Sequence, residues 1–291
     1  MYPYIDIGPV HLGTFGLLLW LAAVVGTIVL HRNFVRNGVD GDALNVVAFV
    51  VIAGVIGAKA WHELQEPATL RMSVARILAP GWPHPLDVAM GFLHWFQAGF
   101  AWFGGMLAGI AMLMWMGRST RFRSLQEGAL GERVGPLRML DLAAPAAAVG
   151  YGVGRIGCLL SGDGDYGIKT TLPWGVHMRP DALVPTPDLV QPTPVYELLY
   201  SLALAWWLWR RAKSRPPVSV ITGEYLVWSG IGRFLVEFVR INPRLYWGMS
   251  NAQVAALGSV VAGILLVAVA RARICGGTQS WPKSLSPDSD L

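Results

Sequence analysis

The sequence predicts an all-α polytopic membrane protein with seven transmembrane helices and irregular arms on its outer side. Of its 291 residues, 54% are hydrophobic and only 14% are charged, a composition typical of membrane proteins rather than soluble domains. Seven apolar runs approach the roughly 20 residues that cross a bilayer as a helix. The Lys and Arg residues also divide unevenly between alternate loops.

The seven expected helices follow one another with short connections, except for two long outer insertions. The expected helical ranges are 13–30, 43–61, 92–116, 140–160, 196–209, 223–239 and 252–270. The insertions, 62–91 and 161–193, contain several prolines and are expected to form irregular arms or a cap. We therefore expect one membrane domain over residues 1–278 and a disordered tail over 279–291, which is rich in Ser, Pro and Asp.

The distribution of basic residues sets the expected orientation. Loops on one side of the membrane contain fourteen Lys and Arg residues, against six on the other side. Because cytoplasmic loops carry the excess of positive charge, we expect the N terminus outside and the C terminus, with its tail, in the cytoplasm. The formal net charge of +5 is mostly this topology signal. Its spread among short loops disfavours a nucleic-acid partner.

The second and third runs contribute four candidate residues near the outer face. Lys59 lies near the outer end of the second run, where a lysine either belongs to a site or extends toward the headgroups. In the third run, Phe103 precedes the pair Gly104-Gly105. Small residues let two helices approach closely, whereas adjacent glycines also suit a bend beside a ligand cavity. Both interpretations stay open for these glycines.

The fourth run ends in the most informative stretch of the chain, residues 154–167. Arg155 lies inside the apolar run, and a glycine-rich turn with two aspartates, Asp163 and Asp165, follows it. A charge near the bilayer centre costs about 2.5–3.5 kcal/mol on insertion scales, so it usually faces the protein interior or a water-filled cavity. The alternative is an arginine that reaches the headgroups from a helix end.

The fifth and sixth runs add a second group of charges. Glu197 follows Tyr196 at the start of the fifth run, just inside the outer boundary. In the sixth run, Arg233, Glu237 and Arg240 share one helical face because they are three and four residues apart. A self-neutralising structural network is one explanation of that face, and a binding site is the other.

All clear intramembrane charges fall in the outer half of the membrane on the expected topology. A proton or ion path would instead place charges across the whole thickness. Arginines bind phosphodiesters through paired donors, and nearby carboxylates orient them or accept a proton. The sequence therefore predicts a site that handles lipid headgroups.

Four blocks of the chain, in order, occur together in one known family. The blocks are Gly104-Gly105, then Gly154-Arg155-Ile156-Gly157-Cys158-x-x-x-Gly162-Asp163 with Tyr166-Gly167, then Tyr196-Glu197, then Gly232-Arg233-x-x-x-Glu237-Phe238-x-Arg240. They resemble the prolipoprotein diacylglyceryl transferases of bacterial inner membranes. The resemblance covers nearly the whole chain and includes the number and orientation of the helices.

The resemblance implies transfer of the diacylglyceryl group of phosphatidylglycerol to the lipobox cysteine thiol of a preprolipoprotein, with release of glycerol phosphate. It implies that Arg155 and Arg233 hold the headgroup phosphate and stabilise it as it leaves. The implied catalytic residues are Arg155, Arg233, Glu237 and Asp163. The implied substrate-binding residues are Lys59, Phe103, Gly104, Gly105, Cys158, Tyr196, Glu197 and Arg240. No metal or soluble cofactor is implied, and the site is expected to open to the outer leaflet and periplasm of the inner membrane.

The chain departs from the family pattern at several positions. Many members have His, proposed as a base, where this chain has Phe103; some have Asn at Cys158 and Glu at Asp163. We expect that Glu237, Asp163 or His62 lowers the cost of deprotonating the substrate thiol, or that phosphate neutralisation dominates. Cys158 itself is expected to be a small buried residue and not a nucleophile.

Two other functional classes remain open. One is a diverged family member with another lipid or acceptor, or with lipid binding and no turnover. The other is a small-solute channel or transporter, which access of engineered cysteines from both sides of the membrane would favour. Access from the outer side alone would favour the enzyme.

Overall fold

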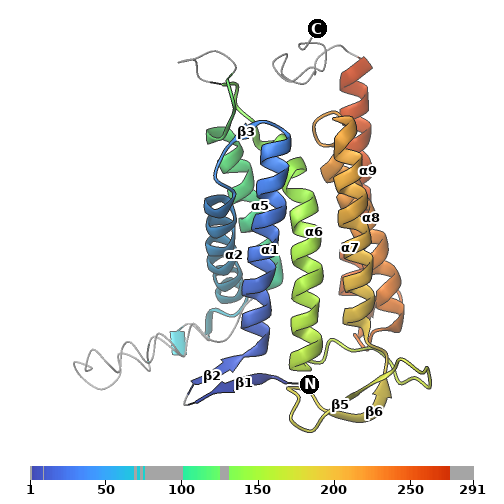
Figure 1. The fold of residues 1–291 in the computed structure, drawn as a ribbon. Coiled ribbons are helices and arrows are strands. Elements are labelled where there is room, and N and C mark those ends of the chain that lie inside the picture. Colours follow the sequence, from blue (N-terminus) through green and yellow to red (C-terminus); the bar gives the residue numbers. More distant parts are fainter. Residues whose placement is uncertain are drawn as a thin grey trace.

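The structure, a computed structural model, describes residues 2–8, 10–68, 71–72, 75, 101–124 and 131–275. These residues are mostly helical and form a bundle in which successive helices run in opposite directions (Figure 1). The helices are α1 (Thr14–Arg36), α2 (Ala43–Gln65), α5 (Trp102–Ser119), α6 (Pro136–Ser161), α7 (Thr193–Arg211), α8 (Val220–Val236) and α9 (Asn251–Cys275). The predicted helical class is confirmed, and every expected range contains a helix.

In the described part of the chain, four pairs of short antiparallel strands precede or connect these helices. The pairs are β1 (Tyr4–Ile7) with β2 (Val10–Gly13), β3 (Val39–Asp40) with β4 (Arg121–Phe122), β5 (Val176–Met178) with β6 (Thr186–Val190), and β7 (Arg244–Tyr246) with β8 (Met249–Ser250). The segment expected to be an irregular outer cap thus contains the β5–β6 hairpin, packed on a small core that includes Tyr166 and Met178. Most of the other insertion and the tail over 279–291 lie outside the described residues.

Two expected helix boundaries are wrong. The range 92–116 is not one helix, because Ala101 has an extended backbone (φ −102°, ψ 119°) and α5 begins only at Trp102; residues 92–100 lie outside the described part. The range 223–239 is also not one α-helix. After Val236 the chain forms a 3-10 turn over Glu237–Val239, and Arg240 is extended.

Four of the described helices are long and apolar enough to cross a bilayer. They are Thr14–Arg36, Ala43–Gln65, Pro136–Ser161 and Asn251–Arg273. Large apolar side chains such as Trp20, Ile56 and Leu265 remain exposed on these helices. An apolar exterior of this kind is stable in contact with lipid and not in water.

Helix α6 lies at the centre of the bundle and contacts α1, α5, α7 and α8 (Figure 1). Its buried surface is rich in small residues, including Ala143, Ala144, Ala146 and Ala148. Helices associate closely through small residues in a membrane, where packing rather than the hydrophobic effect holds them together. The central position of α6 places its C-terminal part, with Arg155, between the two halves of the bundle.

Helices α2 and α5 pack through glycines, which decides between the two interpretations of the Gly104-Gly105 pair. A Cβ atom added at Gly57 would lie 2.5 Å from the Gly104 carbonyl oxygen. A Cβ atom added at Gly105 would lie 3.1 Å from the Gly54 carbonyl oxygen and 3.3 Å from the Ala58 Cβ. Both glycines of the pair therefore serve close helix packing.

We expect Gly104→Ala to lower the free energy of unfolding by about 1–3 kcal/mol, because the new methyl group overlaps the Gly57 backbone and the two helices must separate. Gly105→Ala is the matched control and should cost less, since its new contacts are longer. Thermal unfolding in detergent measures both. Equal stability of the two variants would contradict the packing described here.

Candidate functional site

Three arginines and three carboxylates form one ion-pair network at the end of the bundle where α6 terminates. Arg155 comes from α6, Glu197 from α7 and Arg233 from α8. The other members follow helix ends: Asp165 in the turn after α6, and Glu237 and Arg240 after α8. The formal charges of the six side chains sum to zero, so the network leaves no net charge uncompensated within the apolar bundle.

Glu197 is the centre of the network. Its side chain is only 3% exposed. One carboxylate oxygen accepts hydrogen bonds from Arg233 Nη1 at 2.7 Å and from the Tyr151 hydroxyl at 2.6 Å. The other lies 3.2 Å from Arg155 Nε and 3.4 Å from Arg240 Nη1. One buried carboxylate thus orients all three guanidinium groups.

The three charges predicted to share one helical face do meet, although α8 ends at Val236 and Arg240 lies in extended backbone. Glu237 lies 3.0 Å from Arg233 Nη2 and 3.6 Å from Arg240 Nε. Its second oxygen accepts hydrogen bonds from Asn242 Nδ2 at 2.6 Å and Ser250 Oγ at 2.8 Å. One oxygen of the buried Glu237 side chain thus accepts two hydrogen bonds, whereas the other faces the two guanidinium groups as an ion pair without a hydrogen bond among the described residues.

Asp165 completes the network. The sequence predicted Asp163 as the site residue in this turn and did not predict Asp165. Helix α6 ends at Gly162, whose left-handed φ of 62° reverses the chain, and Gly164 also has a positive φ of 93°. This turn brings the Asp165 carboxylate onto both Arg155 and Arg240. Burial alone would raise the pKa of Asp165, but the Arg240 and Arg155 charges outweigh it and hold that pKa below its usual range. The sequence signal was only a second aspartate in the same turn.

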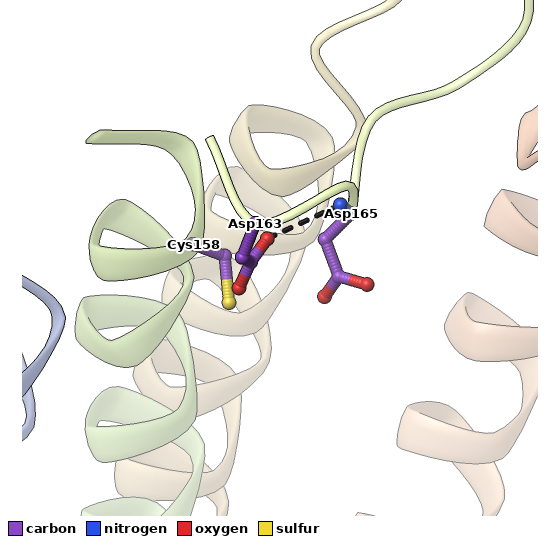
Figure 2. A group of neighbouring side chains, drawn as sticks. All are labelled: Cys158, Asp163 and Asp165. Atoms are coloured by element: carbon purple, nitrogen blue, oxygen red, sulfur yellow. Dashed lines mark hydrogen bonds between the residues drawn. The ribbon is translucent and has the colours of Figure 1, made fainter. Parts of the chain in front are cut away.

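Asp163 lies outside the arginine network, beside Cys158. Its carboxylate accepts the Asp165 backbone N–H at 3.1 Å and lies next to the Cys158 sulfur (Figure 2). Burial raises the pKa of Asp163 above its usual range, and its hydrogen bond with the Cys158 thiol offsets this only in part. Asp163 and Asp165 thus differ in charge environment although they are two residues apart.

Cys158, Asp163 and Asp165 each place one donor atom within 4.8 Å of the others, a spacing that a metal ion requires (Figure 2). Asp165 is already paired with the guanidinium groups of Arg155 and Arg240. The positive charge of these groups repels a cation, so the arrangement does not favour a metal site.

A cavity of about 630 Å³ lies between α5, α6, α7, α8 and α9. Arg155, Glu197 and Arg233 line one end of it, together with Phe103, and the rest of its lining is mostly apolar. The Arg155 and Arg233 side chains are 17% and 24% exposed, whereas Arg240 is 5% exposed and does not line the cavity. Two of the three arginines therefore present donors to this space.

Five other candidate residues lie apart from the cavity lining. Lys59 forms an ion pair with Glu63 at 3.1 Å, one turn away on α2. Gly104 and Gly105 contact α2, as described above. The Tyr196 hydroxyl accepts a hydrogen bond from Trp174 Nε1 at 2.8 Å and so ties the cap to α7. Cys158 is half-buried, with its sulfur 3.8 Å from Arg155 Nη1.

Comparison with known proteins assigns the family. A family model described as prolipoprotein diacylglyceryl transferase matches residues 3–269. The phosphatidylglycerol-prolipoprotein diacylglyceryl transferase of Leifsonia xyli subsp. xyli is 27% identical over 285 residues, which cover 92% of this chain and 77% of that protein. The enzyme named phosphatidylglycerol-prolipoprotein diacylglyceryl transferase 2 from Clostridium perfringens is 28% identical over 256 residues, 87% of this chain and 89% of that protein. The phosphatidylglycerol-prolipoprotein diacylglyceryl transferase of Methylococcus capsulatus is 27% identical over 292 residues, 94% of this chain and 98% of that protein. Because the family model spans most of the sequence, this chain belongs to the prolipoprotein diacylglyceryl transferase family.

Proposed function

We propose that this protein transfers the diacylglyceryl group of phosphatidylglycerol to the lipobox cysteine of a prolipoprotein and releases glycerol phosphate. The observation that carries the proposal is the cavity with Arg155 and Arg233 at one end of an otherwise mostly apolar lining. A phospholipid has the same division into an anionic headgroup and an apolar body. The family assignment supports this reaction for the chain.

The membrane topology that we propose has seven spans, with the N terminus outside and the C terminus in the cytoplasm of a bacterial inner membrane. The alternating directions of the seven helices support it (Figure 1). The excess of Lys and Arg in the loops at the end of the bundle opposite the site also supports it. On this topology the arginine network lies in the outer leaflet, open to periplasmic substrates.

In the proposed reaction, the thiolate sulfur of the substrate attacks the glycerol carbon that is bonded to the phosphate oxygen. The carbon–sulfur bond forms as the carbon–oxygen bond breaks, and its electron pair stays on the phosphate as glycerol phosphate leaves. Arg233 has five N–H donors; its Nη1 donates one hydrogen bond to Glu197, and its Nη2 lies 3.0 Å from Glu237 as an ion pair. The remaining donors can bind the phosphate, whose negative charge grows in the transition state, so these contacts accelerate the step.

The thiol proton needs an acceptor, and we propose Asp163. Glu237 is unsuited to this role because its side chain is only 1% exposed and is paired with Arg233 and Arg240. Glu197 and Asp165 are likewise bound to arginines. Among the described residues, Asp163 is the carboxylate beside the network that forms no ion pair with an arginine, and it already contacts one thiol, that of Cys158.

Asp163→Asn is expected to reduce transfer about 10²-fold, because the variant removes a general base. In the wild type, transfer should fall as the pH is lowered through the raised pKa of Asp163, since only the carboxylate accepts a proton. The loss of transfer at low pH, the acid limb of the pH profile, should therefore begin above the usual Asp pKa of about 3.9. It should be absent in Asp163→Asn. Transfer rates across the pH range, with Asp163→Glu as the control that keeps the carboxylate, check the assignment. An unchanged acid limb in Asp163→Asn would remove Asp163 from this role.

A direct test of the function uses purified protein in phosphatidylglycerol bilayers with a lipobox peptide. The expected result is one glycerol phosphate released for each peptide that gains the mass of a diacylglyceryl group. Folded protein that binds phosphatidylglycerol without either product would instead identify a diverged relative. Reaction of cysteines introduced along the cavity with impermeant reagents from both sides of the membrane would favour a transporter.

A further inference from the structure

The cavity extends from the arginine network toward the middle of the bundle. On α8 its lining runs from Val236 and Arg233 back to Tyr225, and on α9 it runs from Asn251 to Ala262. At 1.5 Å per residue, each of these helical paths is about 16 Å long. One leaflet of a bilayer has a hydrocarbon thickness of about 15 Å, half of the usual 30 Å. The cavity therefore has the length of one leaflet, with charge at one end and a floor at the other.

The wall of the cavity is shaped for a flexible apolar chain. Its α9 side consists mostly of small residues, and these are Ala252, Ala255, Ala256, Gly258, Ser259 and Ala262. Two hydroxyl groups of the opposite wall bond to their own helices, Ser201 to the Leu198 carbonyl at 2.9 Å and Ser229 to the Leu226 carbonyl at 3.4 Å. Hydroxyls that bond back to the helix in this way present little polarity to the cavity.

The floor is formed by larger side chains from two helices. Leu204 of α7 and Tyr225 of α8 both line the cavity at its deep end. Leu204 belongs to a hydrophobic cluster that continues beyond the cavity with Leu208 and Ile221, and Tyr225 packs against this cluster. The lining ends at Leu204, Tyr225 and Ala262, so a chain that enters from the arginine end is expected to stop there.

We propose that this cavity holds an acyl chain of the donor lipid and that Tyr225 and Ala262 set the preferred chain length. The inference rests on the proposed transferase function and adds a specificity determinant to it. The bilayer is as apolar as the cavity, so selection comes from fit and not from the hydrophobic effect. A chain that is too short leaves a void above the floor, and one that is too long must bend against it.

The test compares transfer from dilauroyl, dimyristoyl, dipalmitoyl and distearoyl phosphatidylglycerol. Each lipid is a minor component of the same phosphatidylcholine bilayer, so that membrane thickness stays constant. Ala262→Phe raises the floor and is expected to lower transfer from the longest lipid about tenfold relative to the shortest. Tyr225→Leu deepens the floor and should shift the preference in the opposite direction. Val261→Phe is the matched control, because Val261 is the neighbouring residue on α9 but does not line the cavity.

Ala262→Phe and Tyr225→Leu are expected to shift the preferred chain length in opposite directions. If one of the two variants misfolds, the other still tests the inference. Thermal unfolding of each variant verifies its folding. Wild-type transfer with the same chain-length profile in folded Ala262→Phe or folded Tyr225→Leu would overturn the inference and leave the transferase function intact. No transfer from any of the four lipids by the wild type would overturn both.

Discussion

Arg233→Ala is expected to reduce diacylglyceryl transfer about 10³-fold, the upper range for removal of one group that stabilises charge in a transition state. Arg233 lines the cavity and is the most exposed arginine of the network. Its loss removes phosphate donors and leaves Glu197 and Glu237 with one fewer partner each. Arg155→Ala should have an effect of similar size, because Arg155 faces the same end of the cavity.

Two further variants separate charge from geometry in this result. Arg233→Lys keeps the charge, but a single ammonium group cannot reach both carboxylates and a phosphate, so we expect transfer to stay low. Phe103→Ala removes an apolar group from the same end of the cavity and should have a mild effect. Near-normal transfer by Arg233→Ala, or inactive but folded Phe103→Ala, would contradict the proposed roles.

Glu197→Gln is expected to cost both stability and activity. Glu197 accepts hydrogen bonds from Arg233, Arg240 and Tyr151 and pairs with Arg155, whereas a glutamine amide offers only one acceptor oxygen in its place. Removing one partner of a buried ion pair typically costs about 3–5 kcal/mol, because charge is left uncompensated. We also expect transfer to fall about 10²-fold, since a small displacement of the two arginines from the phosphate has an effect of that size.

Glu224→Gln provides the matched control for this variant. Glu224 pairs with Arg211 at 3.2 Å, is also poorly exposed, and does not line the main cavity. It should affect stability without a comparable loss of transfer. Equal losses of transfer in folded Glu197→Gln and Glu224→Gln would show that Glu197 acts only through general stability.

The positions of the helices and the convergence of the main charges could be predicted from the sequence. Five of the expected charges meet because they lie at the same ends of successive antiparallel helices. They are Arg155, Glu197, Arg233, Glu237 and Arg240. That arrangement follows from hydropathy and loop charge alone.

Local backbone geometry and helix contacts were less predictable. Gly162 and Gly164 have left-handed backbone conformations, and the turn that they form brings Asp165 rather than Asp163 to the arginines. The hydropathy pattern does not predict such backbone conformations. The start of α5 at Trp102 depends on the extended backbone of Ala101, which the apolar sequence does not reveal. The packing of Gly104 against Gly57 requires knowledge of which helices are neighbours.

The most direct test of the central claim measures transfer by the wild type and by Arg155→Ala in the same phosphatidylglycerol bilayers with a lipobox peptide. Peptide mass gain and glycerol phosphate release are read together, with phosphatidylglycerol binding and folding measured in parallel. We expect the wild type to give both products and folded Arg155→Ala to give neither, which would also show that a His before the Gly-Gly pair is dispensable. A folded wild type that binds phosphatidylglycerol and yields no product, or an Arg155→Ala variant that transfers as well as the wild type, would contradict the claim.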